Sequence, residues 1–74
     1  MNAKLQAAPD NFLDENFDPE NQHPADIEQV IIAGYDEYEN LPKFTKIRKQ
    51  YRARYNELVD CLTEKRGFSQ FSHL

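Results

Sequence analysis

The chain has very few of the residues that small domains use for extra stability. Cys61 is its single cysteine, which excludes an internal disulfide, and tryptophan is absent. His23 and His73 have no cysteine or second histidine nearby, so no metal-ligand spacing is present. A chain of 74 residues buries only about 60% of the surface that its unfolded form exposes. We therefore expect oligomerisation or a partner to complete the fold.

Glycines and long apolar runs are also scarce. With Gly34 and Gly67 as its two glycines, the chain contains no glycine-rich phosphate loop. Its longest apolar run, residues 30–33, is far shorter than the roughly 20 residues of a membrane span. The N-terminus lacks the apolar stretch of a signal peptide, and an unpaired cysteine fits a reducing compartment. We expect a cytoplasmic protein that has no membrane partner, no small-molecule substrate and no cofactor.

The sequence offers little support for catalysis. An enzyme needs a pocket that holds a nucleophile or an acid–base pair, and two helices do not enclose one. Cys61 is the only plausible nucleophile, and its place on an apolar helix face is typical of a buried core thiol. We predict a protein that is not an enzyme, with no catalytic, cofactor-binding or metal-binding residues.

Charge is sorted along the chain. Residues 1–41 hold one cation and ten acids, whereas residues 42–74 hold eight cations and three acids. The two parts carry −9 and +5, and the overall charge of −4 hides this difference. An acidic front and a basic back can bind each other, a second copy of the chain, or a charged partner.

Apolar spacing predicts a first helix over 24–41. Pro24 suits the first helical position, and acids in the first turn suit the helix dipole. One stripe at helical spacing comprises Ile27, Val30, Ile31, Gly34, Tyr38 and Leu41. Gly34 on this stripe indicates either close approach of another backbone or a weak point in the helix. Ile32 lies off the stripe beside Tyr35, which hints at a second contact.

A second helix is predicted over 43–66. Its apolar residues are spaced by three and four, in a coiled-coil-like seam made of Phe44, Ile47, Tyr51, Tyr55, Leu58 and Leu62. Gly67 is a natural helix stop, and Pro42 breaks the pattern before the helix. The short connection makes the helices antiparallel neighbours. The predicted fold is therefore all-α: an antiparallel two-helix hairpin over residues 24–67.

Each predicted helix carries charges at one end that its dipole disfavours. The first helix ends in acids at 36–39, and the second begins with cations at 43–49. In an antiparallel hairpin these ends lie side by side, so we expect the charges to cancel across the turn. The same complementarity can act between two chains.

The N-terminal residues 1–23 are predicted to be a flexible acidic arm, and residues 68–74 a C-terminal tail. The arm contains large apolar residues among acids, which is typical of a linear motif that folds on binding. The alternative is that these side chains pack on the helices behind them. The predicted partner-binding residues are Phe12, Leu13 and Phe17 in the arm, with Ile32 and Tyr35 on the first helix.

The functional prediction is a protein–protein interaction module: a small regulator, inhibitor or assembly factor that acts on a larger protein or assembles as a homo-oligomer. The alternative is a nucleic-acid-associated protein, because six cations and no acid lie between residues 43 and 55. Its candidate contacts are Lys46, Lys49, Arg52 and Arg54. A third interpretation, in which the acidic half imitates DNA, requires acids at fixed spacing.

Overall fold

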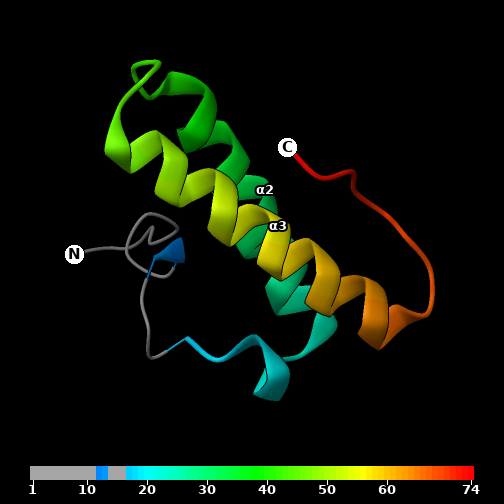
Figure 1. Cartoon of the computed structure of the whole chain (residues 1–74). Coiled ribbons are helices and arrows are strands. Elements are labelled where there is room, and N and C mark those ends of the chain that lie inside the picture. The colour runs from blue at the N-terminus through cyan, green and yellow to red at the C-terminus, as the bar shows by residue number, and fades with distance from the viewer. Residues whose placement is uncertain (1–11, 14–16) are drawn as a thin grey trace.

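The computed structural model describes residues 12, 13 and 17–74, which form a helical hairpin (Figure 1). The elements are the short 3-10 turn η1 (Pro19–Asn21), helix α2 (Pro24–Asn40) and helix α3 (Lys46–Arg66). Helix α3 runs back alongside α2, and the described residues contain no strand. The predicted all-α antiparallel hairpin is confirmed. No helix in the described part is long and apolar enough to span a membrane.

Helix α2 buries the stripe that its spacing predicts. Pro24 occupies the start of the helix, and the N–H of Asp26 donates to the main-chain oxygen of His23. The buried positions are Ile27, Val30, Ile31 and Gly34. The helix ends at Asn40, because Leu41 is already extended and the next residue is proline.

Helix α3 begins three residues later than the predicted start at 43. The Thr45 side chain accepts a hydrogen bond from the Arg48 N–H, which makes Thr45 the N-cap. Phe44, just before this cap, has a left-handed φ of 63° and lies outside the helix. At the other end, Gly67 closes α3 in the left-handed conformation with φ 81°. The prediction that Phe44 belongs to the helical seam is therefore wrong.

The core lies between the two helices and is closed by the N-terminal segment. Tyr51, Tyr55, Leu58 and Leu62 from the predicted seam are buried, together with Val59, whereas Ile47 is 38% exposed. Phe12 is fully buried, and its ring stacks on Tyr51 with 4.8 Å between ring centroids. A methyl group at Gly34 would overlap the Phe12 ring, so the missing side chain at Gly34 makes the space that this ring occupies.

The C-terminal tail folds back along α3 (Figure 1). The N–H of Leu74 donates to Asn56 Oδ1 at 2.7 Å, and His73 Nε2 lies 2.6 Å from Asp60 Oδ1. Phe71 is half-buried against the core. At the start of α2, Glu28 forms an ion pair with Arg66 at 2.8 Å, which ties together the helix ends remote from the turn.

Candidate functional site

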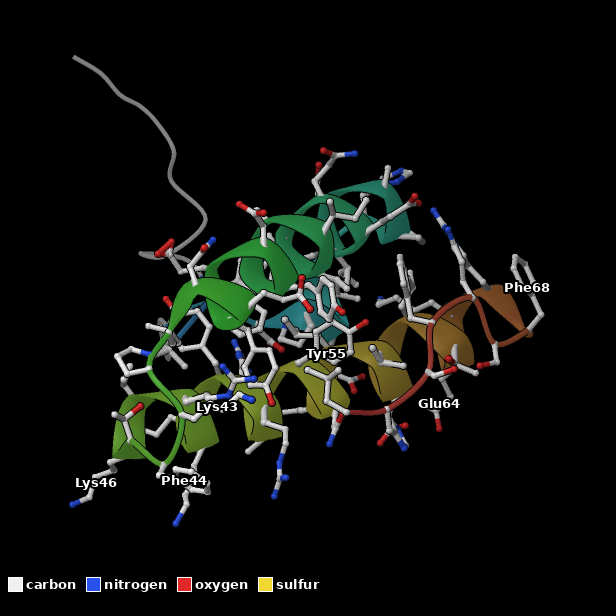
Figure 2. The ribbon with its side chains drawn as sticks, turned by 90° about the horizontal axis from the view of Figure 1, so that it is seen from above. Lys43, Phe44, Lys46, Tyr55, Glu64 and Phe68 are labelled. Atoms are coloured by element: carbon white, nitrogen blue, oxygen red, sulfur yellow. The ribbon has the colours of Figure 1, made fainter. Side chains whose placement is uncertain are left out.

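The turn between α2 and α3 presents an aromatic side chain to solvent. Phe44 is 96% exposed, and Figure 2 shows it pointing outward at the turn, close to Lys43 and Lys46. Its left-handed backbone is uncommon for a bulky residue and costs on the order of 1–3 kcal/mol. The fold therefore holds an apolar side chain in water in a strained conformation.

Exposed cations surround this phenylalanine. We call this region the turn-end surface, which comprises Lys43, Phe44, Lys46, Ile47, Lys49 and Arg52. Its two apolar members are the most exposed phenylalanine of the described part and a partly exposed isoleucine. Within the described part of the chain, none of its four cations lies within ion-pair distance of a carboxylate. Its charge is thus available to a ligand.

A hollow of about 240 Å³ opens beside Phe44. The residues that line it are Tyr38, Lys43, Phe44, Thr45, Arg48, Lys49 and Arg52. Four of these seven side chains are cationic and none is acidic, so the hollow favours an anionic group.

Arg48 fixes one wall of this hollow. Its Nη1 donates to the main-chain oxygens of Tyr38 at 3.2 Å and Leu41 at 2.9 Å, and its guanidinium lies 4.1 Å from the centre of the Tyr38 ring. A cation at these carbonyls offsets the negative end of the α2 dipole. Because no carboxylate of residues 36–39 pairs with a cation of residues 43–49, the expected cancellation between side chains is wrong. The compensation instead runs from Arg48 to the main chain.

The predicted arm residues contact the hairpin in the described structure. Phe12 is a core residue, and Leu13 and Phe17 are partly buried against the same core. Burial leaves no surface of Phe12 for a partner in this conformation. The remaining arm positions, 1–11 and 14–16, lie outside the described residues.

Ile32 and Tyr35 are exposed on α2, at 48% and 38%. The Tyr35 hydroxyl donates to Glu39 Oε2 at 2.9 Å, and this hydrogen bond to a carboxylate raises the pKa of Tyr35. Its ring centroid lies 6.5 Å from that of Tyr38, a residue that lines the hollow. A contact by Ile32 and Tyr35 stays a prediction.

Three of the four candidate nucleic-acid contacts lie together. Lys46, Lys49 and Arg52 belong to the turn-end surface, whereas Arg54 is turned inward. The Arg54 guanidinium donates to the main-chain oxygens of Phe12 and Phe17, both at 2.8 Å, and pairs with Glu57. Arg54 thus holds the N-terminal segment on the hairpin.

Cys61 shows no sign of activation. Its sulfur lies 4.0 Å from Glu20 Oε2, and burial, followed by the Glu20 charge, raises the pKa of the thiol. A raised pKa leaves less thiolate at neutral pH. Within the described residues, no group of three His, Cys, Asp or Glu side chains is arranged to hold a metal ion.

Comparison with known proteins gives no relative: no family model, no curated protein and no solved structure matches the chain. Sequence spacing missed the central residue of the turn-end surface, because Phe44 continues the apolar period of α3 by one step. Thr45, a favourable N-cap residue shortly after Pro42, was the available signal for a later helix start.

Proposed function

We propose that this chain is a non-enzymatic protein-binding module that docks its turn-end surface on a larger protein. It acts there as a small regulator, inhibitor or assembly factor, and the unpaired Cys61 supports a place in the reducing cytoplasm. The observation that carries the proposal is the exposure of Phe44 in a left-handed conformation. Strain of this kind concentrates at functional sites, and it is retained when the feature serves binding.

The chemistry of the turn-end surface is that of an interface centre with a charged rim. Aromatic side chains that fill a partner's pocket dominate the energy of many interfaces. Cations around such an anchor add orientation and association rate more than affinity. Phe44 and Ile47 supply the apolar contact, and the four cations select a partner with anionic groups near its pocket.

A nucleic-acid ligand is the second candidate, since Lys46, Lys49 and Arg52 share a surface with an aromatic ring. The acids around this surface oppose nucleic-acid binding. Acids flank the turn-end surface at 36–39 on α2, and Asp60 and Glu64 follow on α3 beyond the Arg54–Glu57 ion pair. Because an α-helix rises only about 1.5 Å per residue, a nucleic-acid strand that runs along α3 soon reaches these negative charges.

The test places a photo-crosslinking phenylalanine analogue at position 44 or at position 68 in the full chain. Phe68 is a matched control, because it is also exposed, at 57%, but lies in the C-terminal tail. We expect position 44 to crosslink to one larger protein in extracts of the source cells, and position 68 to give much less of that product. Equal crosslinking from both positions, or a product at position 44 that nuclease removes, would overturn the proposal.

A further inference from the structure

The hollow beside Phe44 concentrates positive charge at one point. Lys43, Lys49 and Arg52 line it together with Arg48, and none of its described lining residues is acidic. One carboxylate carries a single negative charge and leaves most of this charge unmatched. A phosphate monoester carries about −1.5 to −2 at pH 7 and offers three strong acceptor oxygens. The positive charge of the hollow therefore matches a phosphate monoester better than a carboxylate.

Arg48 provides a donor that is already oriented. Its hydrogen bonds to the main-chain oxygens of Tyr38 and Leu41 both use Nη1, and no described residue accepts from its Nε or Nη2. The planar guanidinium is held by these bonds and by the Tyr38 ring. A fixed arginine fork is the donor geometry that suits phosphate oxygens, and its prior ordering reduces the entropy lost on binding.

The size of the hollow and its surroundings favour a compact anion. Liquid water occupies about 30 Å³ per molecule, so a hollow of about 240 Å³ has room for a phosphate group and its ester oxygen. The acids at 36–39, Asp60 and Glu64 lie along the two helices beyond the cations. They repel an extended polyanion, whereas a single phosphate stays within the cationic region.

We infer that this hollow binds a phosphorylated side chain of the protein partner, while Phe44 contacts an apolar residue near it. This inference rests on the proposed function and names the chemistry that the turn-end surface recognises. The exposed cations Lys43, Lys49 and Arg52 contact the phosphate oxygens together with the oriented guanidinium of Arg48.

The test is an NMR titration of the isotope-labelled full chain with N-acetyl-O-phosphoserine amide, and with the matching aspartate amide at equal ionic strength. We expect the phosphoserine probe to shift the Arg48 Nε–H signal and the amide signals of residues 44–49, with saturation in the millimolar range. The aspartate probe should bind at least about tenfold more weakly than the phosphoserine probe. Equal shifts with both probes, or none, would overturn the inference.

Two variants that each remove one positive charge locate the binding site. Lys49 lines the hollow, whereas Lys46 belongs to the turn-end surface but does not line it. We expect Lys49→Gln to weaken phosphoserine binding about fivefold or more, and Lys46→Gln to change it less than about twofold. Equal losses in the two variants contradict a site in the hollow. An oligonucleotide of about eight nucleotides that gives the same shifts at micromolar concentration contradicts a protein phosphate as the ligand.

Phosphatase treatment separates this inference from the proposed function. If crosslinking from position 44 persists after the partner is dephosphorylated, the docking surface stands and the phosphate inference fails. If phosphoserine binds the hollow but position 44 gives no protein crosslink, the proposed function fails, and the inference of a phosphorylated protein partner fails with it.

Discussion

At the residue scale, the contact between Gly34 and Phe12 explains how a segment distant in sequence joins the core. The ring takes the space that a side chain at Gly34 would fill, and it stacks on Tyr51. Arg54 then fixes the adjoining main chain through the Phe12 and Phe17 oxygens. One glycine thus decides whether the N-terminal segment packs on the hairpin.

Gly34→Ala should lower the free energy of unfolding, because the new methyl group overlaps the Phe12 ring. In the Phe12→Ala background the same change should instead raise it by about 1 kcal/mol, since alanine has the higher helix propensity. Urea unfolding of the native chain, the two single variants and the double variant measures both effects. A stabilising Gly34→Ala in the native background would show that Phe12 does not occupy this space.

The Cys61 thiol should make stability depend on alkaline pH. Its pKa is raised in the folded chain, so the unfolded chain loses the thiol proton at lower pH. The contribution of the thiol is therefore complete below the ordinary thiol pKa of about 8.5 and is lost as pH rises above it. Raised pKa values of Tyr35 and Tyr55 act in the same direction.

The measurement compares the urea midpoint of the native chain and of Cys61→Ala at about pH 8 and about pH 10. The midpoint of the native chain should fall more over this interval than that of the variant. A fall of the same size in both would mean that Cys61 contributes nothing to the pH dependence.

At the scale of elements, the sequence predicts the helices better than their ends. The stripe around Ile27 and Ile31 predicts α2 to within one residue, and Leu58 and Leu62 predict the buried face of α3. Apolar spacing at 43–47 extends the second helix too far, because periodicity does not register that Thr45 caps the helix. The role of Phe12 depends on a ring that reaches the core from outside both helices, which local spacing does not encode.

Arg48 joins the end of α2 to the start of α3, so its loss should weaken the hairpin. Arg48→Met removes two charge-assisted hydrogen bonds to main-chain oxygens, and we expect the free energy of unfolding to fall by about 2 kcal/mol. Lys49→Met removes the same charge from the neighbouring exposed position. It should change the free energy of unfolding by less than about 0.5 kcal/mol.

Thermal and urea unfolding of these two variants check this prediction. Equal destabilisation would indicate that net charge matters at the turn and that the capping contacts of Arg48 do not.

At the scale of the whole molecule, the sorted charge has two outcomes. Part of the basic half serves the fold, because Arg48, Arg54 and Arg66 bind main-chain oxygens or acids of earlier segments. Within the described part of the chain, the cations of the turn-end surface make no such contact, and they surround the exposed Phe44. The distribution of charge therefore separates cations that hold the hairpin from cations that face solvent around Phe44.

Completion of the fold by a second copy remains a prediction from the thin two-helix core. Sedimentation equilibrium at micromolar concentration tests it, and an oligomeric mass that falls to that of a monomer on dilution is the expected result. A compact, fully helical monomer throughout would contradict it. In that case Phe12 and Phe71, which extend the core beyond the two helices, supply the missing burial within one chain.

The proposed function requires that Phe44 is kept in its strained, exposed conformation for binding. The test compares Phe44→Gly with the native chain in two measurements. One is urea unfolding, and the other is capture of the partner protein that crosslinking from position 44 identifies. Relief of the left-handed strain exceeds the entropy cost of glycine, so the free energy of unfolding should rise by about 0.5–1 kcal/mol. Capture should be lost at the same time, and undiminished capture by this more stable variant would show that Phe44 is not the binding residue.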